Sequence, residues 1–236
     1  MKKKLTLPFF IFIIIFMVLS LPACSEKEPI SQSLSAQEII RDSIDEMKLI
    51  SSFHFELIHE GGRTPIAMGL ELDEAIGDIV KPNRLKTNIT AALGGMLVKV
   101  EVVTIGATTY MTNPLTKKWE LIPGEFSAIS IFDPNAGIAA ILEDMSNPSK
   151  VEDEEKEKGD NSYHIKGEIP SESLRPITLS SVEGVNVVVD VWIDTENFLI
   201  NQIRVEGQIT ETEKPGIVRI LKLSNYNQEV EIQSPM

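Results

Sequence analysis

The sequence has few of the side chains on which most enzymes and metal sites depend. It contains one cysteine and three histidines in 236 residues. It contains no H-E-x-x-H, C-x-x-C, G-x-S-x-G or P-loop motif. His54 and His59 fall on opposite faces of one predicted strand, and His164 lies in another, so they form no metal pair. We therefore expect no catalytic residue, metal ligand or cofactor, and a protein that is not an enzyme.

An excess of basic residues is also missing. The chain has 22 Lys and Arg against 35 Asp and Glu, a net charge of −13. Such an acidic surface disfavours binding to nucleic acid and offers no polybasic hold on anionic lipids. The charged run from Glu152 to Lys158 is more typical of a solvated hairpin than of a catalytic dyad or a calcium site.

Long hydrophobic runs are absent except for one near the start. Basic residues Lys2 to Lys4 precede the run LTLPFFIFIIIFMVLSL, which ends in small residues just before Cys24. This layout is typical of a secretory signal. The residues Leu21-Pro22-Ala23-Cys24 resemble a bacterial lipobox, in which the cysteine is acylated, for example with palmitate. An ordinary signal peptide that leaves a free cysteine, or an uncleaved anchor, would also fit the segment.

Three regions follow from this interpretation. Residues 1–23 are the predicted lipoprotein signal peptide, and residues 24–34 are a polar, flexible tether from lipidated Cys24. Residues 35–236 form one domain. Cleavage would remove three of the basic residues and none of the acidic ones, so the net charge would move from −13 to −16. We expect the protein to be exported and lipid-anchored to the extracytoplasmic face of the cell membrane.

The domain begins with a capping box. Ser35 and Glu38 stand at the spacing at which each side chain bonds the backbone amide of the other residue. A helix should run from there to about Lys48. A second helix is predicted at 135–145, with Asp133 as its N-cap and Pro134 at its first position.

The remaining segments alternate apolar and polar residues with a period of two, which predicts strands. From Phe53, the side chains at 53, 55 and 57 share one face, and those at 98, 100 and 102 share another. Short turns such as Gly94-Gly95 indicate antiparallel neighbours. The predicted strands are residues 53–58, 66–80, 84–90, 96–106, 107–113, 150–156, 163–169, 185–194, 198–209 and 217–232.

These elements predict an α+β fold. One strongly curved antiparallel sheet, a half-barrel, should carry helices packed on its concave face. Small and aliphatic residues dominate the second helix, and only 6% of the chain is aromatic. A space between helix and sheet that is lined by such small and aliphatic side chains can remain an apolar void, although most alanine-rich helix faces are closely packed.

The order of the elements resembles the LppX/LprAFG family of bacterial envelope lipoproteins, and the resemblance spans nearly the whole domain. The segments that carry it are the strand SSFHFEL, the helix start Phe132-Asp133-Pro134, the block YHIKGEIPSESL, the turn VWID at 191–194, and the last strand with Asn227 and Val230.

The resemblance implies a half-barrel similar in plan to the lipid carriers LolA and LolB. It implies a membrane-anchored protein that binds acylated lipid or glycolipid in an apolar cavity, and carries or presents it across the cell envelope. An envelope transporter is an expected partner. The implied cavity residues are Ile40, Ile44, Met47, Phe53, Phe55, Leu57, Val98, Val100, Val102, Ile138, Ile141, Leu142, Val187, Val189, Val191 and Ile203. The alternative is a ligand-free extracytoplasmic protein-interaction or sensor module.

We predict that Cys24→Ser releases the protein from the membrane. No other segment after the cysteine is apolar enough to insert, so the acyl chains would be the sole attachment. Membrane fractions washed with high salt should retain the wild type and lose the variant on immunoblots. A variant that is cleaved and yet stays in the washed membranes would show that the protein has another attachment.

Overall fold

A computed structural model of the chain describes residues 34–66, 69–122, 137–152, 161–175 and 181–236. The predicted signal peptide, Cys24 and the tether up to residue 33 lie outside these residues. The helices are α2 (Ala36–Leu49), α3 (Ile138–Glu143) and the short 3-10 helix η3 (Ser171–Leu174). The strands are β1 (Ser52–Glu60), β2 (Thr64–Pro65), β3 (Leu70–Val80), β4 (Arg84–Leu93), β5 (Met96–Ile105), β6 (Thr108–Thr112), β7 (Trp119–Ile122), β8 (Ser146–Lys150), β9 (Ser162–Pro170), β10 (Asn186–Asp194), β11 (Ile200–Glu206) and β12 (Val218–Ser224).

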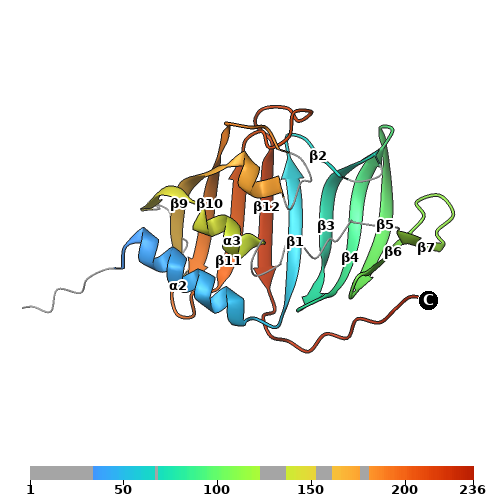
Figure 1. The fold of residues 1–236 in the computed structure, drawn as a ribbon, viewed down its shortest axis with the longest axis horizontal. Helices are drawn as coiled ribbons and strands as arrows, with labels where there is room; N and C mark the ends of the chain where they lie inside the picture. Colours follow the sequence, from blue (N-terminus) through green and yellow to red (C-terminus); the bar gives the residue numbers. More distant parts are fainter. Residues whose placement is uncertain (1–33, 67–68, 123–136, 153–160, 176–180) are drawn as a thin grey trace, which may run out of the picture. The chain divides into compact units, whose positions relative to one another are not determined.

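The strands form one 12-stranded antiparallel sheet (Figure 1). Its order is β7-β6-β5-β4-β3-β1-β12-β11-β10-β9-β8, and the short β2 pairs with β3. Strands β3 to β7 make one meander and β8 to β12 make another. The first strand, β1, lies between them and pairs with β3 on one side and β12 on the other. The fold is therefore mostly β, with a single large open sheet.

Helix α2 begins as the capping box predicts. The Ser35 Oγ accepts a hydrogen bond from the Glu38 amide at 3.3 Å, and a Glu38 carboxylate oxygen accepts one from the Ser35 amide at 2.8 Å. At the other end, Lys81 Nζ donates to the Met47 carbonyl at 2.8 Å, which satisfies one of the last carbonyls of the helix. The bond from Lys81 joins α2 to the turn after β3.

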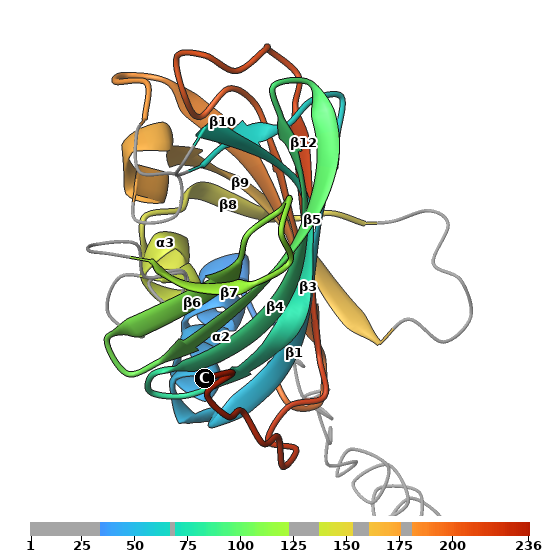
Figure 2. The same cartoon turned by 90° about the vertical axis from the view of Figure 1, so that its right-hand side faces the viewer.

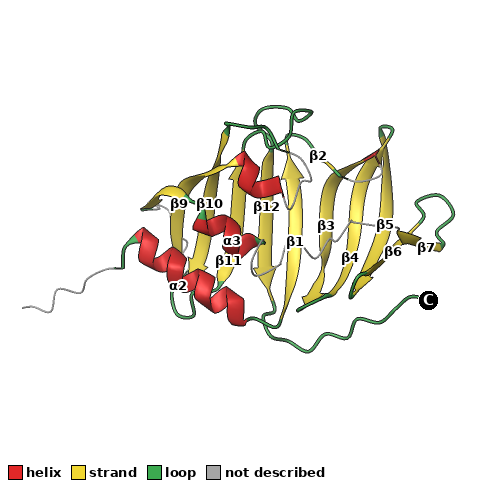
Figure 3. Cartoon of the chain, in the orientation of Figure 1, coloured by secondary structure: helices red, strands yellow, loops and turns green. Residues whose placement is uncertain are grey.

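The helices lie on one face of the sheet. Helix α2 packs against α3 and β8. Figure 2 shows α2 and α3 on the same side of the sheet, and Figure 3 shows the helices in front of the half that contains β8 to β12. Over the described residues, no helix is long and apolar enough to cross a membrane.

The antiparallel sheet was predicted correctly, but the final strand was predicted too long. Strand β12 ends at Ser224 and not at residue 232. Asn225 and Asn227 adopt positive φ angles of 52° and 56°, which turn the backbone out of the strand. The Asn227 side chain then accepts a hydrogen bond from the Ser51 amide at 2.8 Å. The chain after β12 is thus bonded to the start of β1.

Other elements differ from the predicted ones in length and position. The second helix is shorter, Ile138–Glu143, and its predicted cap at 133–134 lies outside the described residues. Of the strand predicted at 150–156, residues 153–156 lie outside the described residues, and Val151 and Glu152 are not in a strand. The strand observed here is Ser146–Lys150, which pairs with β9. Strands β2 and β7 were not predicted. They are two and four residues long, too short to show a period of two.

We predict that Gly77→Ala destabilises the protein. Gly77 lies in β3 opposite Thr87 of β4, and a Cβ there would come within 2.7 Å of the Thr87 Cα. Neighbouring backbone must then move, which typically costs roughly 1–3 kcal/mol. Thermal unfolding should show a melting temperature several degrees lower, at about 2–4 °C per kcal/mol.

Gly94→Asn is the matched control. Gly94 has φ 57° in the β4–β5 turn, with open space around it, and asparagine tolerates this conformation. The control should unfold close to the wild-type temperature. Equal melting temperatures for Gly77→Ala and the wild type would show that β3 and β4 separate without cost.

Candidate functional site

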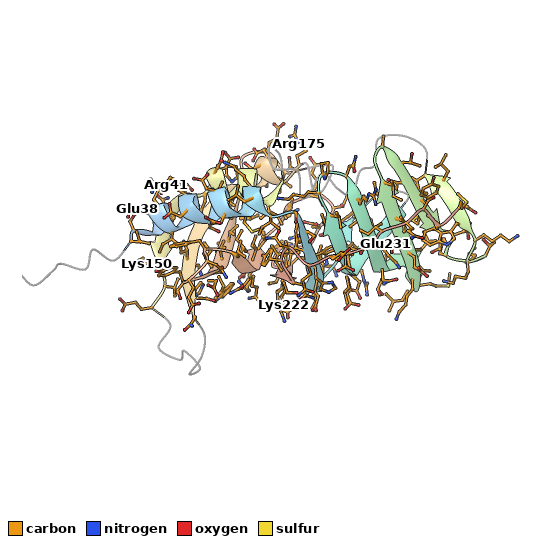
Figure 4. All side chains as sticks on the ribbon, turned by 90° about the horizontal axis from the view of Figure 1, so that it is seen from below. Glu38, Arg41, Lys150, Arg175, Lys222 and Glu231 are labelled. Atoms are coloured by element: carbon orange, nitrogen blue, oxygen red, sulfur yellow. The ribbon has the colours of Figure 1, made fainter. Side chains whose placement is uncertain are left out.

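The candidate site is the apolar face of the sheet that the helices partly cover. Alternation along β1 directs Phe53, Phe55 and Leu57 to this face and His54 to the other. The outer face is charged. His54 Nδ1 lies 2.7 Å from Asp78 Oδ1, and Figure 4 shows Lys222 of β12 on the side of the sheet opposite Arg175. The sheet therefore has one apolar and one polar face.

Cross-strand pairing arranges the apolar side chains in rows. The register places Leu57 directly beside Leu221 of β12 and Ala75 of β3. Continued through the neighbouring strands, it gives one unbroken apolar row across eight strands: Ile165, Val191, Ile203, Leu221, Leu57, Ala75, Ile89 and Val100. Directly opposed side chains are close enough to pack together, so the row is a continuous apolar strip.

The helices add to the same cluster. Ile40, Ile44 and Met47 of α2 are buried against it, as are Ile138 and Leu142 of α3. The structure thus brings the predicted cavity residues into one hydrophobic cluster, with Leu57 and Val98 at its partly buried margin. The Ile141 side chain and Cys24 lie outside the described residues. Their predicted roles in lipid binding or attachment stay predictions.

Exposure varies systematically across the apolar face. Val187 and Val191 of β10 are 0% exposed, so protein atoms surround them on all sides. Along β5, the inward side chains change from Met96 at 65% exposed, through half-buried Val98, to Val100 at 2%. Leu57 and Leu221 in the central row are also half-buried. The apolar face is therefore most accessible toward the end of the sheet where the β4–β5 turn lies.

A buried polar network interrupts the apolar face on β1 and β12, at the end of these strands nearer the β4–β5 turn. Arg219 lies directly opposite His59 in the register, two residues beyond Leu221 and Leu57. Its NH2 lies 2.5 Å from Glu213 Oε1, and its Nε donates to Thr64 Oγ1 at 2.9 Å. Its NH1 donates to the Gly207 carbonyl at 3.1 Å. Nε and NH1 thus donate hydrogen bonds to protein oxygens and NH2 is ion-paired with Glu213, and the network joins β2, β12 and the 207–213 loop.

The hydrogen bonds identify the neutral form of His59. Its Nδ1 lies 3.0 Å from the Asp73 carbonyl, which can only accept, so Nδ1 carries the proton. Its Nε2 lies 2.9 Å from Thr64 Oγ1 and accepts from that hydroxyl. Burial, followed by the positive charge of Arg219, lowers the pKa of His59 from 6.5 to about 4. His59 is therefore uncharged at neutral pH.

Glu213 supplies the countercharge. Burial alone would raise the pKa of this carboxyl, but the hydrogen bond and charge of Arg219 and the amides of Ile209 and Thr210 together lower it. The sequence analysis missed this network. The available signal was Arg219 and His59 at inward positions of otherwise apolar strands, but their pairing depends on the β1–β12 register.

A second polar cluster occupies the outer face. The Trp192 ring stacks on His164 at 4.4 Å, and His164 Nε2 lies 2.9 Å from Asp190 Oδ1. Arg204 NH1 lies 3.6 Å from the other Asp190 oxygen. Within the described ranges, no group of three or more His, Cys, Asp or Glu side chains could hold a metal ion.

Comparison with models of protein families identifies the family of the chain. The family model described as LppX_LprAFG lipoprotein matches residues 35–232, nearly all of the described chain. The chain belongs to the LppX_LprAFG lipoprotein family. The family predicted from the sequence is thus confirmed. Among curated proteins, no sequence matches the chain.

Two solved structures of this family are similar in fold. LprF from Mycobacterium bovis aligns with a TM-score of 0.65 at 17% identity, covering 85% of this chain and 96% of that one. LppX from Mycobacterium tuberculosis aligns with a TM-score of 0.60 at 17% identity, covering 84% of this chain and 98% of that one. At this identity, the likeness concerns the fold. The shared fold spans nearly the full length of both relatives.

We predict that His59 makes the protein sensitive to acid between pH 6.5 and 4. The pKa of His59 is about 4 when folded and 6.5 when unfolded, so the unfolded chain binds the extra proton first. The stabilisation is complete above pH 6.5 and decreases as the pH falls, by up to about 3 kcal/mol at pH 4. Urea unfolding across this range should show the decrease, and His59→Gln should show a flatter profile.

Asn88→Ser is the control for this experiment, because it changes an exposed polar side chain of β4 and removes no titratable group. Its unfolding free energy should keep the wild-type dependence on pH. Protonation of Glu213 acts at a lower pH, below 4.5, and does not overlap the upper part of the range. A His59→Gln profile as steep as that of the wild type would contradict the assignment.

Proposed function

We propose that this LppX_LprAFG protein is a membrane-anchored envelope lipoprotein that binds acylated lipid or glycolipid and carries or presents it across the cell envelope. The observation that carries the proposal is the eight-strand apolar row, together with its partly exposed members Leu57 and Leu221. Acyl chains are stabilised by any apolar surface that removes them from water, in proportion to the area buried. A long apolar strip with accessible side chains suits a chain-like ligand.

In this proposal, the sheet curves as a half-barrel and the helices lie on its concave face. An acyl chain would first contact the half-buried side chains near the β4–β5 turn, namely Val98, Leu57 and Leu221. The fully enclosed side chains, such as Val187 and Val191, would form the wall beneath α2 and α3. The ligand's polar headgroup would remain toward the open end, outside the apolar strip.

The proposed location follows from the sequence. Residues 1–23 would direct export, Cys24 would be acylated, and residues 24–34 would tether the domain to the extracytoplasmic face of the membrane. Residues Leu34–Met236 form a compact unit with its own core, which supports a tethered domain that folds independently of the anchor. An envelope transporter is the proposed source or acceptor of the lipid.

One observation favours a different function. The complete burial of Val187 and Val191, with 2% exposure of Val100 and Val102, is typical of a closely packed core. A ligand-free protein-interaction or sensor module would need no more than this. The two functions differ in whether the purified domain contains lipid.

The direct test is to express residues 25–236, purify the protein without detergent, and extract it for lipid mass spectrometry. This segment contains the whole compact unit. The carrier proposal expects a defined class of acylated lipid in near-stoichiometric amount. Protein that emerges free of lipid, and takes up none from vesicles, would favour the interaction module.

We predict that Val98→Trp reduces bound lipid with little loss of stability. Val98 is half-buried on the inward face of β5, so a larger side chain would occupy space proposed for the ligand. Val102→Trp is the matched comparison on the same strand. Val102 is 2% exposed, and overpacking such a site typically costs roughly 1–3 kcal/mol. Lipid content per protein and thermal unfolding should be measured for both variants.

The wild type should be delipidated before its unfolding is compared, because bound ligand raises the melting temperature. The expected result is less lipid in Val98→Trp at a nearly unchanged melting temperature, and a lower melting temperature in Val102→Trp. If Val98→Trp retained the full lipid content of the wild type, the proposed path along β5 would be wrong.

A further inference from the structure

The β4–β5 and β6–β7 hairpins lie at one corner of the sheet, are linked by a hydrogen bond from Lys117 Nζ to the Lys99 carbonyl, and expose apolar side chains. The hairpin corner comprises residues 93–99, which are the β4–β5 turn and the first residues of β5, and residues 113–119, which are the β6–β7 turn and the first residue of β7. Both segments lie on the right in Figure 1. Met96 is 65% exposed, Leu97 61% and Leu115 78%, among the most exposed large apolar side chains in the described chain. Such side chains at adjoining tips are characteristic of a contact surface.

Hydrogen bonds hold this corner in a defined shape. Asn113 Oδ1 accepts from the amides of Leu115 and Thr116 at 2.9 and 3.0 Å. Lys117 Nζ donates to the Lys99 carbonyl at 3.0 Å, which joins one turn to the strand that follows the other. Leu115 is therefore presented by an ordered turn rather than by a loose loop.

The charge of the corner is opposite to that of the chain as a whole. Its two segments contain Lys99, Lys117 and Lys118 and no carboxylate, whereas the whole chain has 35 acidic residues against 22 basic ones. Glu101 and Glu120 follow the two segments closely in the sequence, and Glu120 Oε1 accepts a hydrogen bond from Asn113 Nδ2 at 3.0 Å, so one carboxylate borders the corner. All three lysines are exposed. An anionic partner is thus favoured here and repelled by most of the remaining surface.

Trp119 completes the surface. It is half-buried, starts β7 and pairs with Thr112, beside the lysines. These side chains match the layers of a bilayer. The exposed apolar side chains suit the acyl region, the lysines suit anionic headgroups, and tryptophan is typical of the membrane–water interface. We propose that the hairpin corner docks on the surface of an anionic lipid bilayer.

The corner adjoins the open end of the apolar face. Met96 belongs both to the corner and to the inward row of β5, which continues through Val98 to buried Val100. Docking would bring the bilayer to the end of this row, where a lipid could pass between membrane and protein. The passage of lipid between membrane and protein rests on the proposed lipid-binding function. The docking itself depends only on the side chains of the hairpin corner.

The test uses residues 25–236, which lack the anchor and contain the compact unit, in flotation with vesicles of phosphatidylcholine with or without phosphatidylglycerol. We expect the wild type to bind vesicles that contain phosphatidylglycerol more strongly than vesicles of phosphatidylcholine alone. Leu97→Asn combined with Leu115→Asn should weaken this binding by roughly tenfold. Leu49→Asn is the matched control, because Leu49 is 75% exposed at the end of α2, away from both turns.

A second pair of variants tests the charge. Lys99→Gln with Lys118→Gln removes two positive charges and leaves the Lys117 hydrogen bond in place. Binding to the anionic vesicles should fall several-fold and become less sensitive to salt. Lys166→Gln with Lys222→Gln removes the same charge from exposed positions on β9 and β12 and should have little effect.

Trp119 gives a direct optical readout. In Trp192→Phe it is the sole remaining tryptophan, and its emission should shift to shorter wavelength when vesicles are added. No binding by the wild type, or equal weakening by Leu49→Asn, would overturn the proposal and leave the corner to a protein partner. Since vesicle binding is measured separately from lipid content, failure of docking and failure of the carrier function are distinguishable.

Discussion

The pairing of β1 with β12 is the constraint on which the rest of the sheet depends. These are the first and last strands of the sheet in the chain, and their pairing joins two antiparallel meanders into one surface. It places Leu57 beside Leu221, which makes the apolar row continuous from β9 to β5. A slip of one residue would turn the inward side chains of β12 to the outer face and bring exposed Lys222 into the core. The apolar face exists only in this register.

The buried polar network also favours the observed register of β1 and β12. Arg219 reaches Glu213 and Thr64 because it lies inward, opposite His59. In any shifted register, the Glu213 carboxylate would lose its cation while remaining buried, and uncompensated buried charge is strongly destabilising. The network therefore favours one register over its neighbours. It also interrupts the apolar face, because it places charged and polar side chains at inward positions of β1 and β12.

The apolar face is graded, and the gradient connects the core with the surface. Under α2 and α3 the side chains are enclosed, and toward the β4–β5 turn they become accessible. The same turn contributes to a corner with lysines and exposed leucines on an otherwise acidic chain. One open sheet thus combines a packed half that supplies stability with an accessible end at which apolar side chains can contact a lipid. A sheet covered completely on both faces would have no accessible apolar side chains of this kind.

The sequence by itself determined most of the strands, the capping of α2 and which side chains face inward, because alternation and capping depend on residues close in the chain. It also carried enough of the element order to predict the family. It did not predict β2 and β7, the end of β12 at Ser224, the Arg219–Glu213 pair or the hairpin corner. Each of these depends on contacts between residues far apart in the chain. Only the tertiary structure decided them, since a local period specifies which face a side chain takes but not which strand lies beside it.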